Sequence, residues 1–147
     1  EDLLHDRPED VLRNVVELLR QADRVSSRKK ISRPLAVVVS KIDAFFEFID
    51  EDSPLRRASS DQPYFDEAES LEVHEHVAML LNEWSGGGLL RMLELNFSTF
   101  RLFAASALGA EPDYARRMAN PRGVLPHRVA EPLLWLMAQR GFLPKEG

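Results

Sequence analysis

Two charged side chains, Lys41 and Asp43, follow directly after Ser40 and the apolar run 35–39. A short run of aliphatic residues that ends at a turn is typical of a strand buried on both faces of a parallel sheet. Such sheets bind their ligands beyond the carboxyl ends of the strands. A carboxylate accepts two hydrogen bonds, and a lysine carries a positive charge on an apolar stem. The spacing therefore predicts that Lys41 and Asp43 contact a ligand.

A second turn, Ser106-Ala107-Leu108, follows the apolar run 100–105, which we also predict to be a strand. The Lys-x-Asp sequence at 41–43 resembles the guanine-specificity motif of P-loop GTPases, Asn/Thr-Lys-x-Asp. The Ser-Ala-Leu sequence at 106–108 resembles the second base-contacting motif of that family, Ser-Ala-Lys/Leu. The two matches occur in the order of the family, and each follows an expected strand.

The resemblance implies a role for each residue of these two turns. Asp43 would accept hydrogen bonds from the N1–H and N2–H₂ groups of guanine, while the stem of Lys41 would cover the base. Ala107 would donate its backbone N–H to the guanine O6, and Ser106 would shape the turn. Adenine has an unprotonated N1 facing the carboxylate, and an unpaired buried polar group costs roughly 1–3 kcal/mol. The implied pocket therefore selects guanine.

The sequence departs from the family pattern in two ways. Ser40 stands where the family has Asn or Thr, so the longer amide that would tie this strand to a phosphate loop is absent, and Leu108 stands where many members have Lys. The phosphate loop Gly-x-x-x-x-Gly-Lys-Ser/Thr is missing, because Gly86-Gly87-Gly88 is followed by Leu89. The Asp-x-x-Gly element is missing as well.

The resemblance covers most of residues 8–142 and implies an α/β fold. We expect the C-terminal half of a Ras-like P-loop GTPase fold of the TRAFAC type, from a bacterial regulatory or conflict-system protein. Residues 1–147 would form a single partial domain, and the start at Glu1 rather than Met fits a fragment. The implied ligand is GTP or GDP, with Mg²⁺ bound only through the missing N-terminal half. We expect no catalytic residue and no hydrolysis by this chain alone; GTP hydrolysis would belong to the intact parent.

Periodicity and capping residues predict short parallel strands with helices on both faces of the sheet. The expected helices cover 8–23, 44–49 (with its aromatic residues packed inward), 71–84, 89–97 and 129–140. Between the strands, about 50–98 forms an acidic loop and a helical insertion. Because about 20–30 residues suffice for a crossover, the surplus is expected to act as a lid or docking surface.

Two helices have apolar faces that the spacing defines. The expected buried face of helix 71–84 consists of Leu71, His74, Val77, Leu81 and Trp84. That of helix 129–140 consists of Leu133, Leu136 and Met137, extended by Trp135. Gly141 is a suitable residue to end this helix, with Phe142 making the hydrophobic contact of a Schellman cap.

Composition excludes several classes of function. The net charge of −5 argues against nucleic-acid binding, and no apolar run is long enough for a membrane span, so we expect a cytoplasmic protein. The absence of cysteine excludes disulfides and thiolate metal sites. His74 and His76 lie on different sides of a helix, so no metal site is expected there. Ser106 lacks the surroundings of a hydrolase nucleophile.

Two hypotheses remain. The first is guanine-nucleotide recognition within a larger GTP-dependent switch that also contacts another protein or domain. The second is a nucleotide-free scaffold, derived from a GTPase fold, that binds another protein through 45–84. A saturating guanine nucleotide would separate them, because a ligand at a hundred times its dissociation constant stabilises a fold by about 2.7 kcal/mol.

Overall fold

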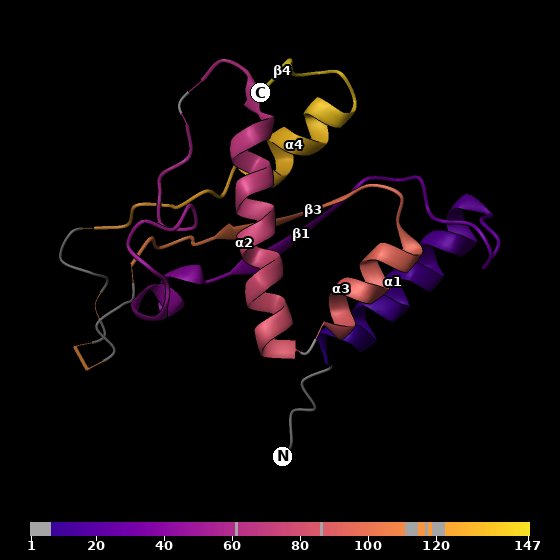
Figure 1. The fold of residues 1–147 in the computed structure, drawn as a ribbon, viewed down its shortest axis with the longest axis horizontal. Coiled ribbons are helices and arrows are strands. Elements are labelled where there is room, and N and C mark those ends of the chain that lie inside the picture. The colour runs from indigo at the N-terminus through magenta and orange to yellow at the C-terminus, as the bar shows by residue number, and fades with distance from the viewer. Residues whose placement is uncertain (1–6, 61, 86, 111–114, 117, 119–122) are drawn as a thin grey trace. The chain divides into compact units, whose positions relative to one another are not determined.

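The computed structural model describes residues 7–60, 62–85, 87–110, 115–116, 118 and 123–147. These residues divide into two compact units, and each is described by itself. The first unit runs up to Leu35 and includes Ala78–Phe100; the second contains Ala36–Val77 and the chain from Arg101 onward. Figure 1 labels the elements in chain order, which are α1 (Pro8–Asp23), β1 (Leu35–Ser40), η1 (Ile42–Phe48), β2 (Phe65–Asp66), α2 (Glu67–Ser85), α3 (Gly88–Asn96), β3 (Phe100–Ala105), α4 (Glu131–Gln139) and β4 (Lys145–Glu146).

The first unit is built around α1 and α3, which pack side by side (Figure 1). α1 begins with Pro at its first position and two acidic residues in its first turn, which suit the positive end of the helix dipole. Each helix buries two aliphatic side chains, namely Leu12 and Val16 on α1 and Leu89 and Leu93 on α3. The predicted helices 8–23 and 89–97 are thus confirmed within one residue.

Arg20, near the end of α1, holds the segment that leads into β1 through hydrogen bonds. Its guanidinium donates to the carbonyls of Ser26 at 2.6 Å and Lys29 at 2.8 Å, and to the Asn96 side chain at 3.0 Å. Ile31, which is fully buried, forms a parallel bridge with Phe97. The approaches to β1 and β3 are therefore paired before the strands begin.

The main sheet pairs β1 with β3, and the two strands run in the same direction in Figure 1. Five of the six β3 residues are buried. β1 is only half-buried, and Val38 is 42% exposed. The prediction that the 35–40 strand is buried on both faces is therefore wrong, because in the structure β3 rather than β1 carries the buried side chains. The mixed α/β class with short parallel strands is confirmed.

A second, smaller sheet pairs β2 with β4 in parallel, Phe65 opposite Lys145. Neither strand was predicted, because two residues are too few to show a period. This sheet adjoins the aromatic core of the second unit, whose buried members are Phe65, Phe103, Trp135 and Ala138. The Phe103 and Trp135 rings meet edge to face with their centroids 5.9 Å apart.

The predicted apolar face of α4 needs correction. Trp135 is 1% exposed and forms the centre of the buried face with Ala138, whereas Leu133 is 62% exposed and Met137 37%. The Schellman cap is present: Gly141 has φ +76°, and the Phe142 N–H donates to the Met137 carbonyl at 2.9 Å. Phe142 itself is 76% exposed, so its predicted hydrophobic contact is not made.

The α2 helix begins four residues earlier than predicted, and its buried face matches the prediction only in part, at Val77. Ser70, Val73 and Val77 are buried, while Leu71 and Trp84 are each 45% exposed. The helix starts earlier because the last residues of the expected acidic loop, from Glu67, form its first turn. The predicted helix 44–49 is a 3₁₀ helix that begins at Ile42, and its Phe48 is 83% exposed rather than packed inward.

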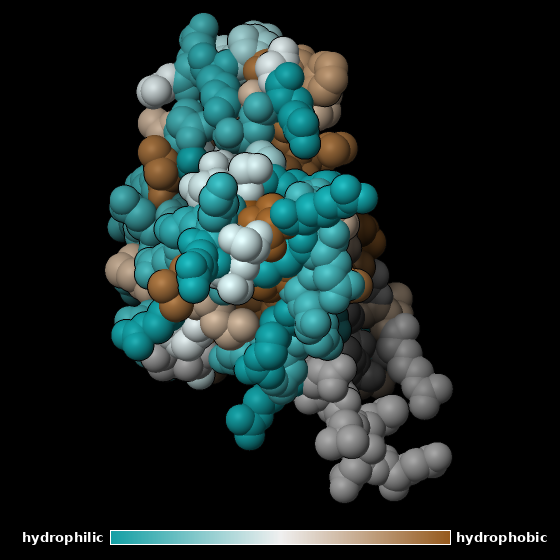
Figure 2. All heavy atoms as spheres, turned by 90° about the vertical axis from the view of Figure 1, so that its right-hand side faces the viewer, coloured by the Kyte–Doolittle hydropathy of each residue, from teal (hydrophilic) through white to brown (hydrophobic). Residues whose placement is uncertain are grey.

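Surface hydrophobicity is scattered where it can be seen. Figure 2 shows a mainly hydrophilic face on which hydrophobic side chains form small, separate patches. Singly exposed hydrophobic residues are normal on protein surfaces. Among the described residues, no helix is both long and apolar enough to cross a membrane.

Candidate functional site

The end of β1 presents Lys41 and Asp43 in an unusual backbone setting. Lys41 has φ +58°, in the left-handed region that residues other than glycine seldom adopt. Such strained residues cost about 1–3 kcal/mol and gather at functional sites. The next residue, Ile42, is fully buried and fixes the start of η1, which leaves Lys41 exposed and Asp43 half-buried.

Neither charged side chain of this turn is paired within the part of the chain that the structure describes. No described residue donates a hydrogen bond to the Asp43 carboxylate, and none forms an ion pair with Lys41. A half-buried carboxylate without a donor is costly to keep desolvated. The N–H donors of a ligand would offset this cost.

The end of β3 is fixed by backbone hydrogen bonds. Ser106 is 2% exposed, its N–H donates to the His127 carbonyl at 2.9 Å, and the His127 N–H donates back at 2.7 Å. The Ser106 hydroxyl accepts from the Gly109 N–H at 2.8 Å, which closes the turn. Ala107 lies exposed between these bonds, and its N–H donates to no described residue.

Gly109 is indispensable to this turn. Its φ is +73°, and a Cβ there would lie 1.8 Å from the Leu125 carbonyl oxygen. The segment that contains Leu125 is held to the turn by the Leu125 N–H, which donates to the Leu108 carbonyl at 3.2 Å. Leu108 itself is 39% exposed.

The six predicted site residues all lie at one edge of the main sheet. β1 and β3 are hydrogen-bonded neighbours, and they end at the same edge in Figure 1. Ser40 is the exposed last residue of β1, followed at once by Lys41 and Asp43; Ser106, Ala107 and Leu108 follow β3. The two predicted turns are therefore brought to the same edge of the sheet.

His127 links the β3 turn to η1, a contact that sequence reasoning did not find. Its ring Nε2 lies 2.7 Å from the Leu55 carbonyl oxygen, and its ring meets the Phe46 ring edge to face at 5.6 Å. The Arg56 guanidinium lies over the Phe46 ring, 5.4 Å from its centroid, and donates to the Phe46 and Ile49 carbonyls. These contacts join residues up to 81 positions apart, so no local pattern reveals them.

A buried arginine, Arg128, anchors the segment that carries His127. Its side chain is 1% exposed, and its backbone has φ +54°. It donates to the Arg57 carbonyl at 2.9 Å and forms ion pairs with Glu69, at 2.5 Å, and with Glu131. Burial raises the pKa of Glu131, and the charge of Arg128 opposes that rise. Removal of one partner from such a buried pair costs about 3–5 kcal/mol.

β3 is also held on its buried side by polar contacts. The His74 Nδ1 accepts from the Leu102 N–H at 3.0 Å, so this nitrogen carries no proton. Burial, and secondly the nearby Arg101 charge, lower the pKa of His74. Arg101 pairs with Glu67, donates to the Ser70 hydroxyl at 3.3 Å and lies 5.8 Å from the Trp135 ring centre. His74 is therefore a support for the strand.

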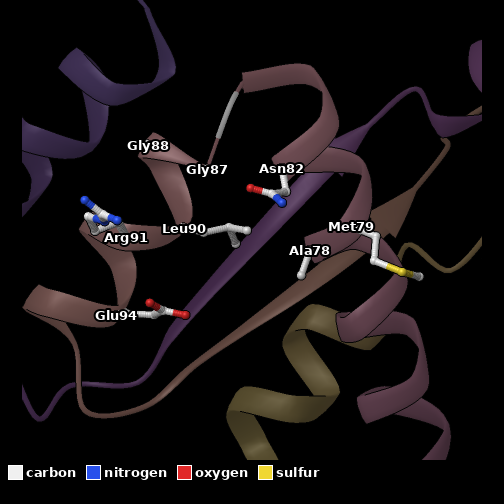
Figure 3. Close-up of a pocket in the computed structure, with 8 residues that line it drawn as sticks. All are labelled: Ala78, Met79, Asn82, Gly87, Gly88, Leu90, Arg91 and Glu94. Carbon is white, nitrogen blue, oxygen red and sulfur yellow. The ribbon is translucent and has the colours of Figure 1, made fainter.

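Each of the two units contains a cavity. In the first unit, a cavity of about 570 Å³ lies between α2 and α3, and Leu90 points from α3 toward α2 (Figure 3). Its lining comprises Ala78, Met79, Asn82, Gly87, Gly88, Leu90, Arg91 and Glu94. In the second unit, a cavity of about 70 Å³ is lined by residues that include Tyr64, Glu69 and Glu131. Neither is lined by Lys41, Asp43 or Ser106.

The structure and the comparisons offer few further constraints. Within the described ranges, no group of three or more His, Asp or Glu side chains is arranged to hold a metal ion. No protein-family model, curated protein or solved structure matches this chain. A function must therefore be argued from the chemistry of the sheet edge itself.

Proposed function

We propose that the chain recognises the guanine base of GTP or GDP at the edge where β1 and β3 end. The observation that carries this proposal is the juxtaposition of two turns that lie 63 residues apart in sequence, Lys41–Asp43 and Ser106–Leu108, on neighbouring parallel strands. Ligands of parallel sheets bind at this edge. The chain would serve as the base-binding part of a GTP-dependent regulatory protein.

Asp43 supplies the selectivity in this proposal. The two donors of guanine, N1–H and N2–H₂, point the same way and match the two oxygens of a carboxylate. Support comes from the half-buried Asp43, whose carboxylate has no donor among the described residues. Adenine would set an acceptor against this anion, at a cost of roughly 1–3 kcal/mol, or about five- to hundredfold in affinity.

The other contacts would come from the Ala107 backbone and the Lys41 side chain. The Ala107 N–H, which donates to no described residue, would donate to the guanine O6. The small side chain of Ala107 lets the ring approach the backbone. Lys41 is exposed and would lay its methylene stem over the base, with its ammonium group directed toward the ribose or phosphates.

The proposal extends to the fold. We assign the chain to the C-terminal half of a Ras-like GTPase domain, in which α2 and α3 form the insertion between the two motif-bearing strands. The sequence contains neither a phosphate loop nor an Asp-x-x-Gly element. Mg²⁺ and the phosphates would therefore be bound by other parts of a parent protein, and the chain alone would not hydrolyse GTP.

A titration with GMP tests the proposal on the chain itself. Base contacts alone should give a dissociation constant of about 1 mM, equivalent to roughly −4 kcal/mol. In two-dimensional NMR spectra, GMP should shift the backbone amide signals of Asp43 and Ala107 together, whereas AMP at the same concentration should leave both nearly unchanged. GMP that shifts neither signal, or AMP that shifts both equally, would contradict guanine recognition.

A second candidate function, a scaffold that binds another protein, is favoured by the cavity between α2 and α3. This cavity lies within the predicted insertion and is lined by the apolar residues Met79 and Leu90 and by the charged residues Arg91 and Glu94. Such a surface suits an amphipathic segment of a partner. The same titration separates the candidates, because a nucleotide-free scaffold would leave the sheet edge unchanged by GMP.

A further inference from the structure

His127 contacts the turn after β3 through its backbone and the helix η1 through its ring. Through its backbone it pairs with Ser106 in both directions, at 2.9 and 2.7 Å, and so forms an antiparallel bridge with the first residue after β3. Through its ring it contacts η1 and the loop that follows it. A single residue therefore contacts both the turn after β3 and η1, the helix that contains Asp43.

The ring contact is specific in its chemistry. A carbonyl oxygen can only accept, so the 2.7 Å contact with the Leu55 oxygen places the ring proton on Nε2. The perpendicular Phe46 ring, at 5.6 Å and 86°, presents the edge-to-face geometry that aromatic pairs prefer. The ring of His127 is thus fixed in both position and orientation.

Phe46 transmits this position to Asp43. Both residues belong to η1, and in a 3₁₀ helix the side chains at i and i+3 are eclipsed on the same side. Arg56 also holds Phe46, because its guanidinium donates to the Phe46 carbonyl at 3.0 Å and lies 5.4 Å from the ring centre. Movement of the His127 ring would therefore move η1, and Asp43 with it.

We propose that His127 is a positioning residue that sets the spacing between the Asp43 carboxylate and the Ala107 N–H. The inference rests on the proposed function, because a rigid purine must meet both groups at once. Guanine has its N1–H and O6 at a fixed separation, and an error of about 1 Å between binding groups sharply weakens such a contact. The buried Arg128, next in sequence, keeps the segment in place.

Two variants of His127 separate its contacts. His127→Phe keeps an aromatic ring against Phe46 but loses the donor to Leu55, while His127→Gln keeps a side-chain N–H but loses the ring. His76→Phe is the matched control, because it makes the same exchange at a half-buried histidine of α2 whose ring contacts the Glu72 carbonyl. All three are compared by melting temperature, by ligand-free amide spectra and by GMP titration.

The expected results distinguish positioning from general stability. Both His127 variants should shift the ligand-free amide signals of Asp43 and Ala107 together and raise the GMP dissociation constant about tenfold. His76→Phe should lower the melting temperature by about as much as His127→Phe does. It should leave the GMP dissociation constant within twofold of the wild type. If one His127 variant fails to fold, the other carries the test.

Three outcomes would overturn the inference. A folded His127 variant with an unchanged GMP dissociation constant would show that the residue does not position the site. Amide shifts confined to one turn would show that the two turns are not coupled through it. An equal loss of GMP affinity in His76→Phe would assign the effect to stability. If the wild-type chain does not bind GMP, the proposed function fails, and the ligand-free spectra still decide the coupling.

Discussion

The two strand ends that form the candidate site are built in opposite ways. After β3, the chain is held by backbone pairs between Ser106 and His127 and by the Ser106 hydroxyl, so the turn is rigid. After β1, the chain passes through the strained Lys41, and the charges of Lys41 and Asp43 have no partner among the described residues. A backbone N–H can bind a ligand only if the chain around it is held in place. A side-chain carboxylate can bind a ligand only if it is not already paired within the protein. Under the proposed base recognition, the turn after β3 would contribute a backbone donor and the turn after β1 a side-chain acceptor.

The strands themselves show the same difference. β3 is buried along most of its length, with β1 on one side and the His74 ring bound to its Leu102 N–H. β1 is half-exposed, as Val38 shows. The end of β3 is therefore the more firmly held of the two strand ends. The turn after β1 leads directly into η1, so its position depends on the contacts of that helix. The rigid turn should be the more sensitive of the two to mutation.

Gly109→Ala should break the rigid turn and is the largest effect that we predict. The left-handed φ costs an alanine about 1–2 kcal/mol, and the clash with the Leu125 carbonyl adds to it, for a loss of about 3 kcal/mol in unfolding free energy. Urea denaturation measures the loss.

Gly141→Ala is the matched control for this substitution. Gly141 has nearly the same φ, +76°, but nothing lies within 4 Å of its added Cβ. Its loss should therefore be only about 1 kcal/mol, from backbone strain alone. Equal losses at both positions would show that the close approach of Leu125 does not constrain the turn after Ser106.

A smaller, pH-dependent effect should come from the support behind β3. The pKa of His74 in the folded chain lies below 6.5, chiefly because of burial and then because of Arg101, with Glu75 opposing. As the pH falls below 6.5, the unfolded chain therefore takes up the proton first, and the stability that His74 contributes above this pH is lost.

The measurement is the unfolding free energy at pH 7.5 and pH 5 for the wild type and for His74→Gln, which keeps an acceptor for the Leu102 N–H. The wild type should lose more stability on acidification than the variant, by less than about 1 kcal/mol because solvent screens a half-exposed ring. A loss that is the same in both proteins would remove His74 from this account.

The sequence was a good guide where the relevant signal is local. Helix 8–23 has its Pro, its acidic first turn and a regular apolar stripe, and the two main strands are apolar runs between turns. The chemistry of the site was also local, since Lys41, Asp43 and Ser106 each follow a strand directly. Their common location at one sheet edge then follows from the pairing of β1 with β3.

Long-range contacts account for what sequence reasoning missed. The β2–β4 pair joins Phe65 to Lys145, and its four residues carry no periodic signal. The buried face of α2 includes Ser70 and Val73, and packing against the rest of the chain decides this rather than the spacing of apolar residues along the helix. His127 and Arg128 find their partners more than 50 residues away, at Leu55 and Glu69, where no local pattern points to them.

The most direct test of the central claim is a change of base preference in Asp43→Asn. Xanthine carries a carbonyl where guanine carries its amine, and the asparagine amide can donate to that carbonyl. The ratio of the dissociation constants for XMP and GMP should fall by at least about tenfold, or about 1.4 kcal/mol. Glu47→Gln removes one negative charge from an exposed position of the same helix and should leave the ratio unchanged. An unchanged ratio in Asp43→Asn, or an equal change in Glu47→Gln, would contradict base recognition by Asp43.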